Sequence, residues 1–155
     1  MAELLIRPAA AQDCVLILAL LRELAAYEKL LDIFVTDEAA IARDFFGARP
    51  LAQCDLGFEG DMAVGLVTYF WTYGSFTTKR GLFVEDLFVR PVFRGRGHGK
   101  ALLRHLAAKG ADRLEWRVLD WNESALAFYR GLGAEPVAGW QDWRLEGDAV
   151  KALAA

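Results

Sequence analysis

The stretch VEDLFVRP at residues 84–91 is followed, at residues 94–103, by RGRGHGKALL. An apolar strand that carries carboxylates therefore runs through a short basic turn into a glycine-rich helix start. Glycines at such a place leave backbone N–H groups uncovered, and this geometry receives a pyrophosphate. Glu85 lies about one strand length upstream, close enough to act on whatever the phosphate compound carries. The two segments together predict a cofactor site with a candidate base beside it.

The glycines at 95, 97 and 99 have two other interpretations, a dinucleotide-binding loop or a turn that merely tolerates a tight connection. A dinucleotide-binding fold would place an acidic residue at the end of a following parallel strand, and this sequence has none there. The basic side chains of Arg94 and Arg96 add positive charge to the turn. These features favour a phosphate-binding loop of a different fold.

The bulk properties indicate one globular domain over residues 1–155, with 55% hydrophobic and 25% charged residues. A net charge of −3 without a basic tract argues against nucleic-acid binding, and no apolar run approaches the ~20 residues that span a membrane. Cys14 and Cys54 lack metal-ligand spacing, and with no signal-peptide pattern they indicate a reducing, cytoplasmic setting. His98 is expected near phosphate and His105 at the surface, with no metal site.

Hydrophobic periodicity and turn residues predict alternating strands and helices. Helices are expected after Asp13, from Thr36 or Asp37 to 46, and over 97–109 and 122–132; strands are expected over 3–8, 51–58, 62–73, 82–89, 114–119, 134–139 and 142–146. Residues 74–81 are expected to form a loop, and the C-terminal tail to be frayed. The order β-α-α-β-β-β-α-β-α-β-β predicts an α/β fold with a mixed, mostly antiparallel central sheet flanked by helices.

The carboxylates of Glu85 and Asp86 are adjacent in a strand, so their side chains are expected to point to opposite faces. A carboxylate in an apolar strand should have a raised pKa, which helps it to receive a proton from an ammonium group. Taken alone, a carboxylate in a strand is more often an ion-pair partner. Asn122 suits a helix N-cap, and its amide could also reach a ligand. Tyr129, two turns later, could donate a proton to a leaving thiolate or could simply pack.

Taken together, these segments resemble the GNAT acetyltransferase superfamily. RGRGHG at 94–99 resembles its acyl-CoA pyrophosphate loop, Arg/Gln-x-x-Gly-x-Gly/Ala. The resemblance extends to the diamine (spermidine/spermine) N-acetyltransferase-like branch through short segments over nearly the whole chain: IRPA at 6–9, DC at 13–14, ELA at 23–25, YE at 27–28, EDLFV at 85–89, WNE at 121–123, FY at 128–129, GA at 133–134 and WR at 143–144. It implies a GNAT fold and direct acetyl transfer from acetyl-CoA to a primary amine of a small molecule, without a covalent enzyme intermediate.

The resemblance also implies roles for individual residues. Glu85 would bind the amine and accept its proton, and Tyr129 would protonate the departing thiolate. The cofactor-binding residues would be Leu87, Phe88, Val89, Arg94, Gly95, Arg96, Gly97, His98, Gly99, Lys100, Asn122, Ser124 and Tyr129. The substrate-binding residues would be Tyr27, Glu28, Glu85, Asp86, Glu115, Trp116 and Arg117. No metal is implied, and a homodimer is expected because members of this branch are commonly dimeric.

One segment departs from the polyamine-acting relatives, which carry extra acidic residues shortly after the Tyr-Glu pair. Here Glu28 is followed by Lys29-Leu30-Leu31, with only Asp32 nearby. Each adjacent charge contact is worth on the order of 1–4 kcal/mol at moderate dielectric, so the change can alter acceptor preference. A diamine, a polyamine and a lysine-like amino acid such as thialysine stay open as acceptors. A non-catalytic acyl-CoA-binding module and an enzyme acting on a protein amine are the alternatives.

Overall fold

The structure, a computed structural model, describes residues 3–155 and divides into two compact units between Arg117 and Val118. The first unit contains β1 (Leu4–Pro8), α1 (Cys14–Tyr27), α2 (Glu38–Phe46), β2 (Gln53–Glu59), β3 (Met62–Gly74), β4 (Lys79–Val89), α3 (His98–Ala107) and β5 (Arg113–Trp116). Short 3₁₀ turns lie at Ala11–Asp13, Leu31–Ile33 and Pro91–Phe93. The second unit contains α4 (Glu123–Gly131) and α5 (Asp148–Ala154).

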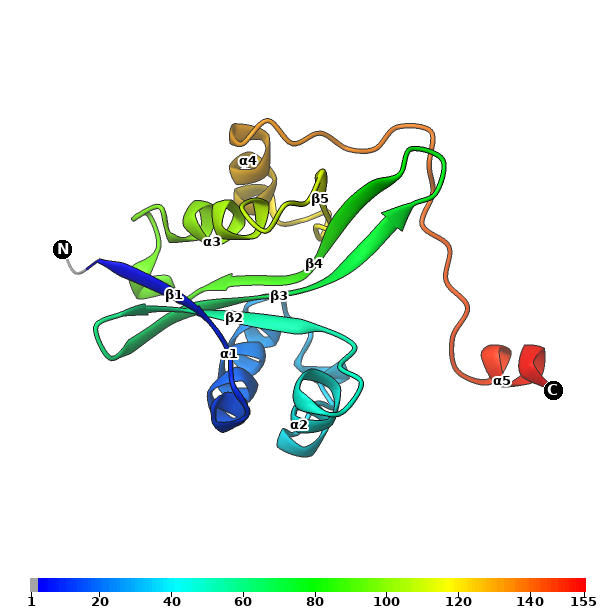
Figure 1. Cartoon of the computed structure of the whole chain (residues 1–155), viewed down its shortest axis with the longest axis horizontal. Coiled ribbons are helices and arrows are strands. Elements are labelled where there is room, and N and C mark those ends of the chain that lie inside the picture. The colour runs from blue at the N-terminus through cyan, green and yellow to red at the C-terminus, as the bar shows by residue number, and fades with distance from the viewer. Residues whose placement is uncertain (1–2) are drawn as a thin grey trace. The chain divides into compact units, whose positions relative to one another are not determined.

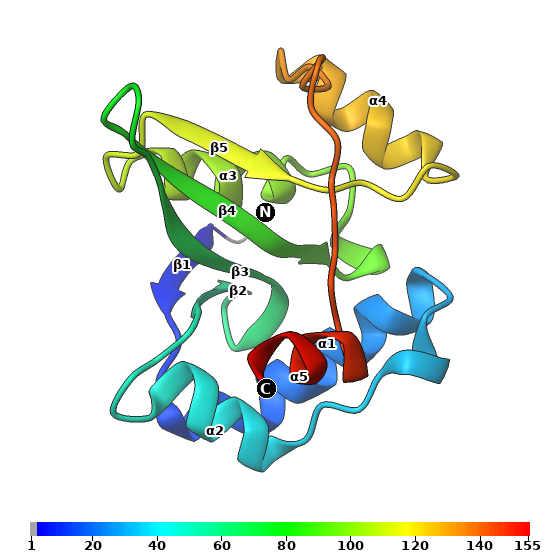
Figure 2. The ribbon, with the colours of Figure 1, turned by 90° about the vertical axis from the view of Figure 1, so that its right-hand side faces the viewer.

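The first unit is built on a five-stranded sheet with the order β1-β2-β3-β4-β5. The pairs β1–β2, β2–β3 and β3–β4 are antiparallel, whereas β4 and β5 are parallel. Helices α1 and α2 cover one face of this sheet and α3 covers the other (Figure 1), and β4 lies between β3 and β5 (Figure 2). The mixed, mostly antiparallel sheet flanked by helices confirms the predicted fold class.

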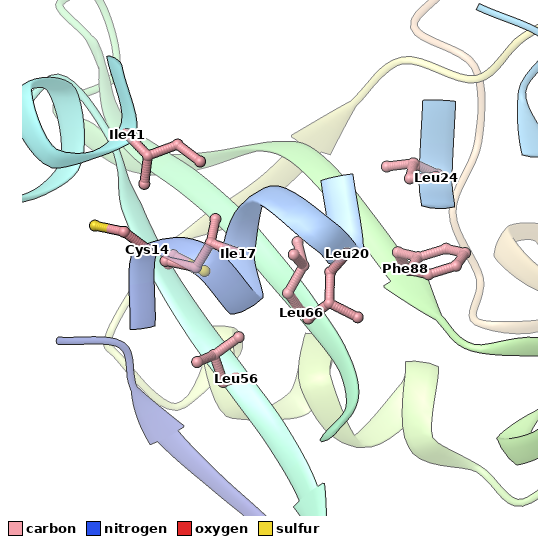
Figure 3. Packing of buried hydrophobic residues seen from close by; sticks show 9 residues of the cluster. Cys14, Ile17, Leu20, Leu24, Ile41, Leu56, Leu66 and Phe88 are labelled. Atoms are coloured by element: carbon pink, nitrogen blue, oxygen red, sulfur yellow. The ribbon is translucent and has the colours of Figure 1, made fainter. Parts of the chain in front are cut away.

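The core on the α1 face is a cluster of buried hydrophobic side chains, mostly aliphatic, that also includes Cys14, Cys54 and Phe88 (Figure 3). Ile17, Leu20 and Leu24 recur at spacings of three and four along α1, so one side of the helix faces the sheet. Leu56 on β2 and Leu66 on β3 are fully buried against them. Each buried side chain of this size contributes about 1.5–3 kcal/mol, and the cluster fixes α1 on the strands that carry the site.

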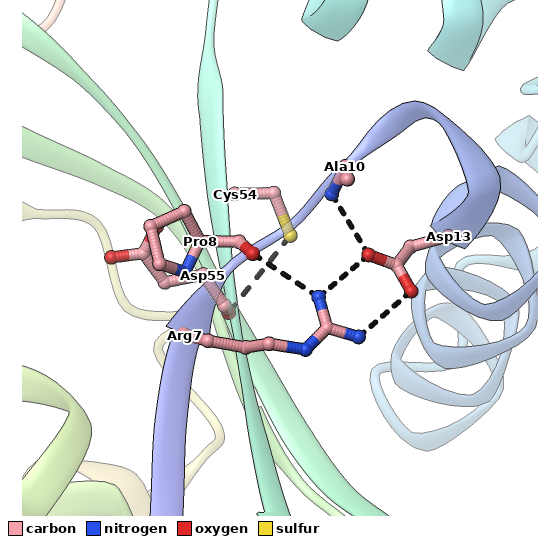
Figure 4. A network of polar contacts seen from close by, with 6 residues as sticks. All are labelled: Arg7, Pro8, Ala10, Asp13, Cys54 and Asp55. Carbon is pink, nitrogen blue, oxygen red and sulfur yellow. Dashed lines mark hydrogen bonds and ion pairs between the residues drawn. The ribbon is translucent and has the colours of Figure 1, made fainter.

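Asp13 is the N-cap residue of α1, as the sequence suggests, but its side chain makes no capping hydrogen bond to that helix and instead joins β1 to the helix start (Figure 4). Its carboxylate accepts hydrogen bonds from the Arg7 guanidinium at 2.7 and 3.0 Å and from the Ala10 N–H at 2.8 Å. The Arg7 guanidinium holds the pKa of Asp13 below its usual value. Asp37 does cap α2, because its side chain accepts the N–H of Ala40 at 2.7 Å.

A β-bulge interrupts the pairing of β3 with β4. Thr68 pairs with Asp86 while its neighbour Tyr69 pairs with Val84, so Glu85 has no residue opposite it. A bulge adds one unpaired residue to a strand and changes the direction of nearby side chains. The regular alternation expected for Glu85 and Asp86 therefore does not apply at this point.

Several local predictions are wrong, and the strand expected over 114–119 runs only over Arg113–Trp116. The strands expected over 134–139 and 142–146 are absent from the second unit, where the residues between α4 and α5 form no backbone ladder. Pro136 lacks an N–H and Gly139 has a left-handed φ of 82°, and both oppose a strand. The tail is not frayed but forms α5. The loop expected over 74–81 is shorter, because β3 reaches Gly74 and β4 begins at Lys79.

Candidate active site

The glycine-rich turn leads directly into the N-terminus of α3. Gly95 and Gly97 have φ angles of 74° and 84°, and a side chain at either position would find open space within 4 Å. Glycine is therefore needed for backbone conformation, not for lack of room. Gly97 is the residue before the helix, and the first N–H groups of a helix have no partner within it. A left-handed turn joined to a helix N-terminus fits the pyrophosphate of a CoA compound.

Two arginines and a histidine hold this turn against the rest of the first unit. Arg94 Nε donates to the Val89 carbonyl oxygen at 2.8 Å, and the Arg94 guanidinium lies 4.4 Å from the ring centroid of Tyr27. Arg96 and His98 both contact Glu59, at 3.1 and 2.6 Å. His98, predicted as a loop residue near phosphate, is the buried first residue of α3. Lys100 and Gly99 follow in the first turn of α3, with the Lys100 side chain exposed.

Sequence reasoning missed Glu59. It ends β2, carries only 6% of its side chain exposed, and belongs to no motif. Only its place just before the Gly60-Asp61 turn could have drawn attention to it. The contacts with Arg96 and His98 appear only when β2 and the turn come together in space.

The backbone of β4 has an edge without a strand partner beyond the bulge. β5 pairs with β4 over residues 81–84 only, ending at the pair Val84 and Trp116. The backbone N–H of Arg90 donates a hydrogen bond to the Val64 carbonyl oxygen on β3, at 2.8 Å. Because backbone groups alternate along a strand, those of Leu87 and Val89 point to the opposite edge. The Leu87 backbone groups and the Val89 N–H can bond to an extended ligand, while the Val89 carbonyl oxygen already accepts Arg94 Nε and the Phe88 side chain lies in the core.

The two adjacent carboxylates of β4 have different environments. Glu85 is exposed on the bulge, whereas Asp86 is half-buried and accepts the Thr68 hydroxyl at 2.5 Å. Burial raises the pKa of Asp86 above its usual value, the charge of Glu85 adds to the rise, and the Thr68 hydrogen bond opposes it. The raised pKa that the sequence predicts for a carboxylate of this strand is thus found at Asp86.

A second acidic group comes from the end of α1. Tyr27 is the last residue of that helix and Glu28 follows as its C-cap. Burial and then the negative charge of Asp86 raise the pKa of Glu28. Glu23, one turn earlier, is occupied by the Arg90 guanidinium at 2.7 Å. A cation that reached Glu28 and Asp86 would relieve the repulsion between them.

The predicted substrate residues Glu115 and Trp116 lie on β5, the edge strand that pairs with β4. Glu115 and Trp116 are half-buried, and Glu115 pairs with Arg113 at 3.2 Å. Arg117 ends the first unit, with its guanidinium 5.3 Å from the ring centroid of Phe83. The carboxylate of Glu115 is therefore already partly neutralised by its own strand.

The second unit holds the remaining predicted residues on α4. Asn122 is the N-cap, as predicted, and its side-chain oxygen accepts the Ala125 N–H and the Ser124 hydroxyl, each at 3.2 Å. The side-chain oxygen of Asn122 is therefore used in capping α4. Tyr129 lies two turns into the helix, with its ring centroid 5.2 Å from that of Phe128.

His105 is not the surface residue that the sequence suggests. Its Nε2 lies 2.6 Å from Asp55, which is buried on β2 and also contacts Lys109 at 3.0 Å and the Tyr69 hydroxyl at 3.2 Å. This cluster ties the C-terminal part of α3 to the sheet. Over residues 3–155, no set of His, Cys, Asp or Glu side chains is arranged to hold a metal ion, and no helix has the length and hydropathy to cross a membrane.

Comparisons with known proteins agree with this geometry. The family model for the acetyltransferase (GNAT) family matches residues 24–134. The chain is 37% identical to the thialysine N-epsilon-acetyltransferase of Sus scrofa, with 99% of each chain covered. It is 30% identical to an L-ornithine N5-acetyltransferase of Arabidopsis thaliana, over 96% of this chain and 86% of that protein. It is 33% identical to a human spermidine/spermine N(1)-acetyltransferase-like protein, over 90% of this chain and 22% of that protein.

Among solved structures, an integron cassette protein from Vibrio cholerae superimposes with a TM-score of 0.82 and 25% identity, covering 99% of this chain and 98% of that one. The predicted family, branch and fold are confirmed by these matches. The chain belongs to the GNAT acetyltransferase family, in the diamine acetyltransferase-like branch, and is an N-acetyltransferase.

Proposed function

We propose that this enzyme transfers the acetyl group of acetyl-CoA to the terminal amine of a lysine-like amino acid. The observation that carries the proposal is the charge pattern at the end of α1. The negative charge of Asp86, after burial, raises the pKa of Glu28, so the two carboxyl groups are near enough to attract one ammonium group together. Lys29 follows immediately, exposed and with a left-handed φ of 60°. A cation beside an acidic pair suits an acceptor that carries both an ammonium and a carboxylate. The thialysine and ornithine specificities in the names of two relatives support the same acceptor class.

The donor site is proposed along β4 and the glycine-rich turn. Residues 94–100 would bind the pyrophosphate through backbone N–H groups and through Arg94, Arg96 and Lys100. The outward backbone groups of Leu87 and the N–H of Val89 would bind the pantetheine arm, with Phe88 packing beneath them. Asn122, Ser124 and Tyr129 are proposed to contact the rest of the arm. When bound, acetyl-CoA supplies an acetyl group on a good leaving group.

Two side chains are proposed to move protons. Glu85 takes a proton from the acceptor ammonium, directly or through a water, so that the nitrogen lone pair can form the new N–C bond at the acetyl carbonyl. Tyr129 gives its phenolic proton to the sulfur as the C–S bond breaks. The second proton, which the nitrogen loses on becoming an amide, returns through water to the Tyr129 phenolate, so that one proton in all is left on Glu85. A backbone N–H of β4 that bonds to the carbonyl oxygen would contribute roughly 3 kcal/mol.

The acceptor side is proposed to comprise the substrate-binding residues predicted from the sequence. Tyr27, Glu28 and Asp86 would surround the amine, and Glu115, Trp116 and Arg117 would lie along the rest of the molecule. Lys29 would pair with the α-carboxylate, a group that putrescine and spermidine lack. The pairing would therefore favour amino acids over polyamines.

The test is CoA thiol release with thialysine, lysine, ornithine, putrescine, spermidine and a peptide with a free N-terminus. We expect the highest kcat/KM for one of the amino acids. A preference for spermidine would contradict the argument from Lys29, and a preference for the peptide would favour an enzyme acting on protein amines. Binding of CoA without thiol release for any amine would indicate a non-catalytic module.

Three further properties are proposed together with the function: the domain organisation, the oligomeric state and the location in the cell. The family match over residues 24–134 runs across the boundary of the two units, which supports a single N-acetyltransferase domain over 1–155. The exposed aromatic rings of Trp71, Tyr73 and Phe76 on the β3–β4 hairpin support a homodimer, which light scattering would test. The buried free thiols of Cys14 and Cys54 support a cytoplasmic location.

A further inference from the structure

A carboxylate outside the predicted site holds the glycine-rich turn in place. Glu59 ends β2 and is paired there with Leu4 of β1 and Met62 of β3. Its Oε1 lies 2.6 Å from His98 Nε2, and its Oε2 accepts from Arg96 Nη1 at 3.1 Å. A buried charge is costly unless it is paired, so the contacts with His98 and Arg96 compensate for the burial of the Glu59 carboxylate.

The two partners of Glu59 flank Gly97, the left-handed residue before α3. A glycine in open space has wide conformational freedom, and a side chain at 97 would touch nothing within 4 Å. The orientation of the peptide groups around Gly97 therefore depends on how their neighbours are held. The Arg96 guanidinium also donates to the Val92 carbonyl oxygen at 3.2 Å. Within residues 3–155, the His98 ring has its polar contact with Glu59 only.

From this arrangement we propose that Glu59 is a positioning residue for pyrophosphate binding. It orders the turn before the cofactor arrives, so that the N–H groups at the start of α3 already point at the phosphates. Ordering a binding loop in advance strengthens binding by reducing the entropy lost on association. The inference rests on the proposed donor site and adds a residue that never touches the donor.

The charge of Glu59 predicts the opposite effect. A carboxylate close to a phosphate site repels the ligand, so on charge alone Glu59→Gln would tighten CoA binding. If positioning dominates, the same variant weakens CoA binding. The sign of the change therefore separates the two effects.

The test measures dissociation constants of CoA and of pantetheine, which lacks the pyrophosphate, by titration calorimetry on the full chain. For Glu59→Gln we expect CoA binding to weaken by about tenfold or more, the loss that corresponds to one hydrogen bond between the turn and a charged ligand, and pantetheine binding to stay largely unchanged. Asp13→Asn is the matched control, because it also breaks an arginine–carboxylate pair of the first unit but lies in the β1–α1 connection. It should lower the unfolding temperature and leave both dissociation constants as they are.

Equal weakening of CoA and pantetheine, unchanged CoA binding or tighter CoA binding in Glu59→Gln would each overturn the proposal. Glu59→Asp is a second variant, which keeps the charge but is one methylene too short to reach both partners, and the same selective loss is expected for it. If the wild-type chain binds pantetheine and CoA equally well, the proposed donor site itself is wrong. If it binds CoA more tightly but the Glu59 variants lose nothing selectively, only the positioning role is wrong.

Discussion

Replacing Gly97 by alanine tests whether the turn before α3 is the pyrophosphate site. Gly97 has a φ of 84°, a conformation that costs an L-residue about 1–2 kcal/mol. A Cβ there would meet nothing within 4 Å, so the cost is conformational and not steric. Alanine also lowers the entropy of the unfolded chain, which offsets about 0.4–1 kcal/mol. We therefore expect a net loss of stability of up to about 1.5 kcal/mol, or a few degrees in Tm.

The effect on cofactor binding should exceed the effect on stability. The alanine relieves its strain by rotating the peptide groups beside it, and these carry the N–H groups proposed to face the phosphates. Loss of one hydrogen bond to a charged group costs about 1.5–3 kcal/mol, which corresponds to roughly 10- to 150-fold weaker CoA binding.

Gly110→Ala is the matched control for Gly97→Ala. Gly110 has a φ of 89° after α3, and its nearest neighbour for a Cβ is an Arg80 side-chain nitrogen at 3.8 Å, an ordinary contact. Both variants should lose similar stability in denaturant titrations, and only Gly97→Ala should lose CoA affinity by calorimetry. Equal CoA affinity in the two variants would show that the turn does not hold the pyrophosphate.

Three further predictions concern single side chains. Tyr129→Phe should lower kcat by about 10²- to 10⁴-fold while sparing the CoA dissociation constant, and a turnover equal to wild type in a thiol-release assay would contradict its role as the acid. Lys29→Glu should shift kcat/KM from amino acids toward spermidine by on the order of tenfold, measured by competing the two acceptors, whereas Lys151→Glu on α5 should shift nothing. Burial raises the folded-state pKa of Asp86, so the stabilising contribution of this carboxyl is present at low pH and is lost as pH rises through that pKa. Asp86→Asn should therefore raise Tm at pH 7 and leave it unchanged near pH 3. Parallel thermal melts at the two pH values would check this.

The features that the sequence predicts well depend on local chemistry. The glycine-rich turn and the N-caps at Asp37 and Asn122 all lie where predicted, because each is specified by residues within a few positions. The strands expected over 134–139 and 142–146 fail for the opposite reason. Alternating apolar residues describe a strand only if another strand supplies its hydrogen bonds, and a sequence pattern does not contain that partner.

The site residues also divide into those that local sequence reveals and those that only the fold reveals. Glu85, Asp86 and the loop glycines are visible because carboxylates and glycines are unusual in their local setting. Glu59 and its two partners are separated by nearly forty residues, and the distance of 2.6 Å from Glu59 to His98 follows only from the packing of β2 beside α3. Positioning residues of this kind are ordinary in composition, and so they are found from structure.

The unpaired residue Glu85 in β4 changes which face of the sheet its neighbours Val84 and Asp86 point to. In a regular strand Val84 and Asp86 would share a face, because residues two apart point the same way. Their partners Tyr69 and Thr68 are consecutive and therefore face opposite ways, so Val84 and Asp86 are also on opposite faces. Val84 is buried in the core, Asp86 is near enough to Glu28 for its charge to raise the pKa of that group, and Glu85 between them is exposed. Without the bulge, either Val84 would leave the core or Asp86 would leave Glu28, and the strand could not combine a packed core with an acceptor site.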